Sequence, residues 1–204
     1  MNYNKNHWEN IYKTKQANEV SWTQAIPTTS LELLSQFDLP KSAKIIDIGG
    51  GDSHFVDHLL EAGYENISVL DISKAALDRA KRRLGEAAKK VNWIVSDITE
   101  YAPTQSFDLW HDRATFHFLT TKEQIEQYLT IVKTTSSKYL IIATFSEKGP
   151  KKCSGLEIKQ YSESDLEAQF KNGFDKLWCK TEDHITPFKT VQNFTFCSFK
   201  KQSN

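Results

Sequence analysis

Short apolar runs rich in isoleucine and valine alternate along the chain with segments of helical periodicity. The runs are KIIDI (44–48), ISVLD (67–71), VNWIVSD (91–97), FDLWHD (107–112) and KYLIIATF (138–145). Such alternation is typical of βαβ units, in which successive strands join one parallel sheet. The pattern therefore predicts an α/β fold with five parallel strands.

Capping residues mark the helices between these runs. Ser73 is expected to cap a helix that carries an Ala/Leu stripe and ends at Gly85. Thr121 and Gln124 form a capping-box pair for the helix after the fourth strand. Both helices thus begin on the residue types that favour a helix start.

Two more capping-box patterns lie within residues 1–40. Asn6 with Glu9, and Thr29 with Glu32, each precede apolar residues at helical spacing. We expect these two helices to form a cap on the rest of the domain and to lie across the open edge of the sheet.

The pattern changes after residue 150. A helix from Ser162 to Phe170 is followed by FDKLWCKTEDHI (174–185) and QNFTFCSFKK (192–201), with no helix between these runs. Two β-rich runs without an intervening helix pair as an antiparallel hairpin. The predicted fold is a Rossmann-like three-layer sandwich: a mostly parallel seven-stranded sheet ending in an antiparallel hairpin. We expect residues 1–204 to form a single domain with its core over 41–204.

Charge and hydropathy exclude several function classes. Lysine plus arginine and aspartate plus glutamate both total 26, so the formal net charge is zero. No global field then attracts nucleic acid or anionic lipid. The longest aliphatic run, YLIIA (139–143), is far shorter than a membrane span or a signal sequence. We expect a soluble, cytoplasmic protein with no nucleic-acid and no membrane partner.

The three cysteines are Cys153, Cys179 and Cys197. An odd number at wide spacing, with no CxxC pair, argues against a disulfide framework or a zinc site and favours a reducing compartment. Cys153 follows GPKK in a loop over 147–155, where we expect an exposed but unreactive thiol.

Three consecutive glycines follow the first predicted strand in the segment IIDIGGGDSHF. Gly49, Gly50 and Gly51 lie where a strand meets a helix, and backbone without Cβ can approach a ligand closely there. A dinucleotide fingerprint needs a third glycine at the position of His54, whose side chain would obstruct helix–strand packing. The pattern therefore disfavours a nicotinamide or flavin cofactor.

Two carboxylates add to the glycine segment. Asp71 ends the second strand, where it can accept hydrogen bonds from ribose hydroxyls, and Asp97 ends the third, where it can accept from an adenine amino group. Ligands of open α/β sheets bind at the carboxyl ends of the strands. We therefore expect the glycines, both aspartates and the WHD of strand four to converge on one crevice.

The ordered set DIGGGDS, VLDIS, SDI and FDLWHDR resembles the class I, seven-stranded methyltransferases that use S-adenosylmethionine (SAM), over residues 40–200. The resemblance implies SAM as cofactor and S-adenosylhomocysteine (SAH) as product. It implies that the glycine loop contacts the methionine part, although Ser53 replaces a glycine that is frequent in the family. The cofactor-binding residues expected on this basis are Trp22, Asp47, Gly49, Gly50, Gly51, Asp71, Ile72, Asp97, Ile98 and His111.

A closer resemblance is to small bacterial methyltransferases that carry a WHDRAxxHFL segment, here residues 110–119, together with an SW pair that includes Trp22. The same region is similar to thiopurine and to elongation-factor lysine methyltransferases. The catalytic candidates are Asp112 for positioning, Arg113 for an acceptor carboxylate, and His117 as a base. The alternatives are a structural Asp112–Arg113 ion pair, a packed His117 and a packed Trp22.

Two further features have simpler interpretations. His54 and His58 lie four residues apart on one helix face but have no third ligand, so no metal is predicted. The basic run RAKRR (79–83) lies opposite an Ala/Leu stripe and is interpreted as a solvated helix face.

The sequence thus predicts a SAM-dependent methyltransferase that acts on an unidentified small-molecule acceptor. The alternatives are a protein-lysine methyltransferase on the same fold and a non-catalytic SAM- or nucleotide-binding module.

Overall fold

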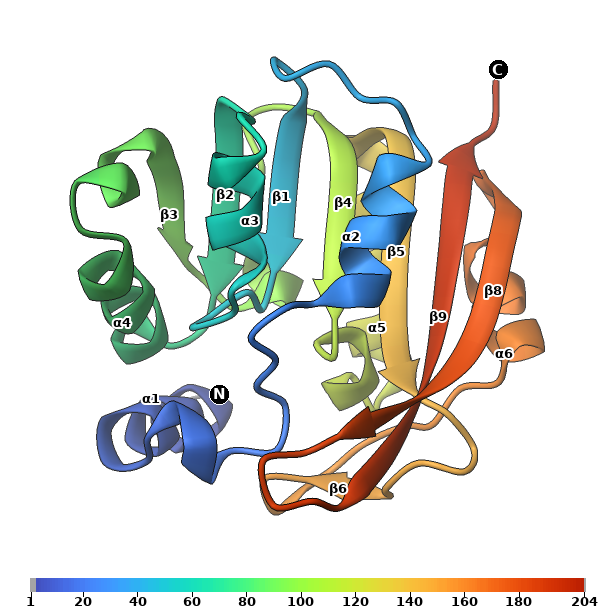
Figure 1. The fold of residues 1–204 in the computed structure, drawn as a ribbon. Coiled ribbons are helices and arrows are strands. Elements are labelled where there is room, and N and C mark those ends of the chain that lie inside the picture. The colour runs from blue at the N-terminus through green and yellow to red at the C-terminus, as the bar shows by residue number, and fades with distance from the viewer. Residues whose placement is uncertain (1–2, 204) are drawn as a thin grey trace.

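A seven-stranded sheet forms the centre of the computed structural model, which describes residues 3–203 (Figure 1). The strand order is β3-β2-β1-β4-β5-β9-β8. The strands are β1 (Lys44–Ile48), β2 (Asn66–Asp71), β3 (Val91–Val95), β4 (Phe107–Arg113), β5 (Ser136–Phe145), β8 (Phe174–Ile185) and β9 (Val191–Lys201). The first five pair in parallel, whereas β9 pairs antiparallel with β5 and β8. The predicted seven-stranded architecture is confirmed.

Helices cover both faces of this sheet. The helices α2 (Thr28–Ser35), α3 (Phe55–Glu61) and α4 (Lys74–Leu84) pack on one face, and α5 (Lys122–Thr135) and α6 (Glu163–Phe170) on the other. Short 3₁₀ turns are η1 (Ala17–Glu19), η2 (Gly85–Lys90), η3 (Ile98–Glu100) and η4 (Phe116–Phe118). A two-stranded ribbon, β6 (Lys152–Cys153) with β7 (Leu156–Glu157), lies in the connection before α6.

The core divides between the two faces because successive strand residues point to opposite sides. In β1, Ile45 packs with the α2–α3 side, while its neighbours Ile46 and Ile48 pack with the α5–α6 side. Both faces of the central strands are therefore buried under helices, which explains why these strands are continuous apolar runs in the sequence.

The helix starts test the capping predictions. The Ser73 side chain accepts from the Ala76 N–H at 3.2 Å, and the Thr121–Gln124 capping box is present, so both predictions are confirmed. The predictions at Asn6 and Thr29 are wrong, because both residues lie inside their helices.

The N-terminal helices also lie elsewhere than predicted. Helix α1 (Tyr3–Thr14) packs on α4 beyond the carboxyl ends of the parallel strands, and α2 lies on the sheet face against β5 (Figure 1). Neither follows an open edge of the sheet, because α2 buries Leu33 and Leu34 in the core.

The cysteine prediction is corrected by the C-terminal hairpin. Cys179 on β8 and Cys197 on β9 are directly opposite in the antiparallel register, with a Cα–Cα distance of 4.2 Å, and form a disulfide. Cys153 is free but buried rather than exposed. Counting and spacing could not reveal a pairing that is set by the hairpin register.

Residues 3–203 contain no helix long and apolar enough to cross a bilayer.

Candidate functional site

Two adjoining pockets open at the carboxyl ends of β1, β2, β3 and β4. The first is lined by side chains from the strand ends and from α1, among them Trp8, Tyr12, Trp22, Asp71, Ile72, Asp97, Ile98 and Arg113. The second is lined by Asp47, Gly49, Gly50, Ser53, His54, His111 and Arg113, among others. Tyr12, Trp22, Gly49 and Arg113 line both pockets, so the two pockets lie side by side.

The loop after β1 is shaped by glycine. Gly49 and Gly51 have φ values of +64° and +45°, a region that side-chain-bearing residues rarely adopt. A Cβ on Gly51 would lie 2.8 Å from Asp71 Oδ2 and 3.0 Å from the Tyr12 hydroxyl. The loop therefore runs close against both side chains and presents bare backbone to the site.

Asp71 is a buried carboxylate at the end of β2. Its Oδ1 accepts from the Ser73 N–H at 2.7 Å, and its Oδ2 is the atom that faces Gly51. Burial, reinforced by the negative charges of Asp47 and Glu9, raises the pKa of Asp71 to about 7. A hydrogen bond from a ligand hydroxyl group would stabilise the ionised form of this buried carboxylate.

Asp47, at the end of β1, is held by a buried histidine. Its Oδ1 lies 2.6 Å from His111 Nδ1, and His111 Nε2 lies 2.8 Å from the Ser30 hydroxyl. Asp47 Oδ2 is buried and has no hydrogen-bond partner among residues 3–203. A buried acceptor without a partner is costly, so this oxygen is suited to a donor from a bound ligand.

The third aspartate and two isoleucines complete the first pocket. Asp97 Oδ1 accepts from the N–H of Thr99 at 2.9 Å and from its hydroxyl at 2.8 Å, which fixes the carboxylate at the pocket wall. Ile72 and Ile98 follow Asp71 and Asp97 and add apolar surface. The structure thus brings the predicted residues at the ends of strands one to three together.

Arg113 lies where the two pockets meet. Its Nη1 donates to the Trp22 carbonyl at 3.0 Å, and its guanidinium lies 5.1 Å from the centre of the Phe194 ring. Its Nε and Nη2 atoms are buried without a hydrogen-bond partner in the described part of the chain, and no ion pair with Asp112 forms there. Burial lowers the pKa of Arg113 to about 10, so the group stays charged at neutral pH.

Asp112 and His117 lie behind the pocket wall. Asp112 accepts from the Thr115 N–H at 2.8 Å and from the Tyr128 hydroxyl at 2.6 Å, so it shapes the turn after β4. His117 Nδ1 accepts from the Phe145 N–H at 3.2 Å. Burial, reinforced by the charge of Arg113, lowers the pKa of His117 to about 3. Neither side chain lines either pocket.

Helix α1 supplies residues that the sequence did not identify as cofactor contacts. Glu9 Oε2 accepts from the Ser73 hydroxyl at 2.9 Å and from the Ala75 N–H at 3.1 Å, which attaches α1 to the first turn of α4. Tyr12 then lies against Gly51, and Trp8 meets Trp22 edge to face with ring centres 5.6 Å apart. The sequence signal at these positions was the WxxxY spacing of Trp8 and Tyr12.

The remaining candidates have local partners. His58 Nε2 lies 3.2 Å from the Ala25 carbonyl and Nδ1 lies 3.2 Å from Glu61, and within the described ranges no group of three potential metal ligands occurs. Cys153 lines the first pocket, and burial raises the pKa of its thiol to about 12.

The chain is similar to known methyltransferases. A family model described as a methyltransferase domain matches residues 45–135. Malonyl-[acyl-carrier protein] O-methyltransferase 1 of Ilyobacter polytropus is 28% identical over 144 residues, covering 70% of this chain and 51% of that protein. The eEF1A lysine and N-terminal methyltransferase of Mus musculus is 25% identical over 119 residues, covering 58% of this chain and 17% of that protein.

The chain thus spans about half, or less, of the length of these relatives. A SAM-dependent methyltransferase from Anabaena variabilis has the same fold, with a TM-score of 0.73 at 13% identity over 97% of this chain and 95% of that one. Residues 45–135 thus match a methyltransferase domain, and the described chain has the fold of a SAM-dependent methyltransferase of known structure.

Proposed function

We propose that the chain binds SAM in the adjoining pockets and transfers its methyl group to a small acceptor that carries a carboxylate. The observation that supports the acceptor class most is the buried guanidinium of Arg113 between the pockets, whose Nε and Nη2 atoms have no hydrogen-bond partner among residues 3–203. Within this proposal α1 and the segment around Trp22 are the part of residues 1–40 that caps the cofactor and substrate site, whereas α2 belongs with 41–204 to the Rossmann-like core of one domain.

Each part of the cofactor can be assigned to residues that line the two pockets. Asp71 Oδ2 would accept from the ribose hydroxyls, and Asp97 from the adenine amino group, between the apolar side chains of Ile72 and Ile98. The loop over 49–51 would contact the methionine part, where the unpartnered Asp47 Oδ2 suits an amino-group donor. His111 would act through Asp47, whose orientation it fixes.

The chemistry needs alignment more than acid–base groups. Bound SAM supplies a methyl group on a sulfonium, which is already activated for displacement. The protein's part is to hold the acceptor in line and to exclude water. Trp8, Trp22 and Phe118 form an aromatic wall of the first pocket. Trp22 would also attract the sulfonium through a cation–π contact, worth about 0.5–2 kcal/mol.

The three catalytic candidates divide into different roles. Arg113 would bind the acceptor carboxylate through paired hydrogen bonds. Asp112 would position the turn after β4 through its bonds to Thr115 and Tyr128. His117 supports packing rather than proton transfer, because its low pKa and its placement behind the pocket do not suit a general base.

A protein-lysine substrate is the alternative that the relatives raise. A lysine amine entering the first pocket would approach the buried Arg113 cation, and like charges in such a site repel. The small anionic acceptor therefore fits the electrostatics better. A non-catalytic binding module would not need a buried cation whose Nε and Nη2 atoms have no hydrogen-bond partner within residues 3–203.

Binding measurements test the cofactor assignment. Calorimetry should show that the wild-type chain binds SAM and SAH at one site and does not bind NAD. NAD binding without SAH binding would overturn the assignment.

Turnover with methyl-labelled SAM, against small carboxylic acids, tests the acceptor class. Arg113→Met keeps the aliphatic stem and should raise the KM of a labelled acceptor by about 100-fold, since a paired charge-assisted contact contributes about 1.5–3 kcal/mol per bond. SAH affinity should fall much less than the KM rises, because Arg113 holds the cofactor side only through its hydrogen bond to the Trp22 carbonyl. A large loss of SAH affinity, or label only on lysine in a protein, would overturn the acceptor role of Arg113.

A further inference from the structure

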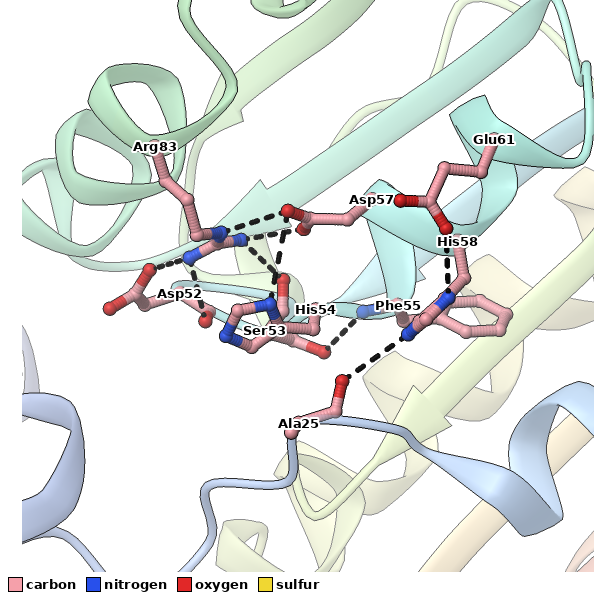
Figure 2. Close-up of polar contacts among 9 residues, drawn as sticks. All are labelled: Ala25, Asp52, Ser53, His54, Phe55, Asp57, His58, Glu61 and Arg83. Carbon is pink, nitrogen blue, oxygen red and sulfur yellow. Dashed lines mark hydrogen bonds and ion pairs between the residues drawn. The ribbon is translucent and has the colours of Figure 1, made fainter.

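The basic run over 79–83 is not the uniformly solvated face that the sequence predicts. Arg82 is exposed, but the Arg83 side chain is only 24% exposed and turns toward the glycine loop and the start of α3 (Figure 2). This correction links a helix that follows β2 to the loop that follows β1.

Arg83 uses its whole guanidinium in this contact. Nε and Nη2 donate to the two carboxylate oxygens of Asp57, at 3.0 and 2.8 Å. Nη2 also donates to the Ser53 carbonyl at 2.8 Å, and Nη1 donates to the Asp52 carbonyl at 3.2 Å and to the Asp52 carboxylate. Figure 2 shows the guanidinium between these three residues.

Two of these acceptors are backbone carbonyls of the cofactor loop itself. Asp52 and Ser53 line the second pocket beside Gly49 and Gly50. The Ser53 N–H donates to the Gly50 carbonyl at 2.7 Å, so fixing Ser53 also fixes the turn that begins at Gly50. A shift of the Ser53 carbonyl would therefore move the backbone that faces the ligand.

The contact also balances charge. Asp52 and Asp57 are both mostly buried, with side chains 17% and 19% exposed, and would repel each other without a cation between them. A lysine has three donors on one atom and cannot reproduce the planar fork that spans a carboxylate and two carbonyls. The site therefore needs arginine rather than any positive charge.

We propose that Arg83 is a positioning residue that holds the loop over 49–53 in the shape that binds the cofactor. The hydrogen bond from Arg83 on α4 fixes the backbone at Ser53, where this loop ends. The inference rests on the proposed SAM site. It predicts that cofactor affinity depends on a side chain that does not itself line the second pocket.

The test compares Arg83→Lys with Arg82→Lys, an equally conservative change at the exposed neighbouring position. SAH affinity is measured by calorimetry at a temperature well below the melting point of every variant, which separates loop geometry from global unfolding. Arg83→Lys should raise the Kd of SAH by about tenfold, which corresponds to about 1.4 kcal/mol. Arg82→Lys should leave it within twofold.

A double variant adds a second measurement of SAH affinity, which tests whether Arg83 and its carboxylate partner act on the same loop. If Arg83 acts by holding the loop, then Asp57→Asn, which changes a partner of Arg83 outside both pockets, should also weaken SAH binding, and combining it with Arg83→Lys should weaken binding no more than the stronger single change does. Unchanged SAH affinity in Arg83→Lys, even with a lower melting temperature, would overturn the inference while leaving the SAM site intact. Absence of SAH binding by the wild-type chain would instead overturn the proposed function.

Discussion

Replacing Asp71 by asparagine should move the stability of the free protein and its affinity for SAH in opposite directions. The change preserves the shape of the side chain and the Oδ1 acceptor for the Ser73 N–H, which lies 2.7 Å away. It removes the charge from a residue that is 5% exposed and that lies near the negative charges of Asp47 and Glu9.

The stability effect follows from the raised pKa. A folded-state pKa of about 7, against an ordinary value of 3.8, means that ionised Asp71 costs the free protein about 4 kcal/mol above pH 8. This contribution is smallest below pH 4 and grows as the pH rises to 7. Because a carboxamide also leaves an N–H group to satisfy, we expect Asp71→Asn to stabilise the free protein by about 2 kcal/mol at pH 8. At pH 4, where Asp71 is protonated in the folded protein, only the cost of the unsatisfied N–H group remains, so the same change should destabilise the free protein by about 2 kcal/mol.

The affinity effect has the opposite sign. Hydroxyl donors to a carboxylate contribute about 1.5–3 kcal/mol each, and an amide oxygen accepts more weakly. The Kd of SAH should therefore rise by about 10- to 100-fold in Asp71→Asn, and further in Asp71→Ala.

Urea unfolding of the free protein at pH 4 and 8, together with calorimetric SAH titration at pH 8, measures both effects. Asp78→Asn on α4 is the matched control, since Asp78 pairs with Lys74 and lies outside the two pockets of the site. It should change neither quantity by more than a small amount. An unchanged SAH Kd in Asp71→Asn would remove Asp71 from the cofactor site, and a destabilised free protein at pH 8 would refute the burial argument.

Three further outcomes are expected. The SAH affinity of the wild-type chain should fall as the pH drops below about 7, because protonated Asp71 no longer presents a negative charge to the ligand's hydroxyl groups. In the same calorimetric series the SAH affinity of Asp71→Asn should depend less on pH, and equal slopes for the two proteins would contradict this. EDTA should leave SAH affinity and thermal unfolding unchanged, since residues 3–203 contain no group of three candidate ligands; stoichiometric zinc whose removal unfolds the protein would refute it. The Cys179–Cys197 disulfide closes a loop with a sequence separation of 18, so its reduction should lower the free energy of unfolding by about 3 kcal/mol with little change in SAH affinity. Urea titration with and without dithiothreitol measures this difference, and equal stability under the two conditions would contradict it.

The sequence predicted features that depend on local pattern. Strand runs and helix caps such as Ser73 are encoded within a few residues, and the strand ends at Asp71 and Asp97 converge because parallel strands share a carboxyl edge. These features follow from periodicity and topology alone.

Features that depend on tertiary contact were missed or assigned differently. Glu9 has the spacing of a cap for its own helix but binds the first turn of α4. Arg83 belongs to a run that looks solvated, yet it contacts a loop about thirty residues away in the chain. His117 belongs to a motif that suggests chemistry, but the turn after β4 directs it into the core. In each case the partner is distant in sequence, so spacing carries no signal.

Incubation of the chain with methyl-labelled SAM and a cell lysate, separated into small-molecule and protein fractions, tests the central claim most directly. The account predicts label in an acidic small molecule, formed together with an equal amount of SAH and nearly lost with Asp71→Ala. Label confined to protein lysine, or no methyl transfer to any fraction by a chain that binds SAH, would contradict it.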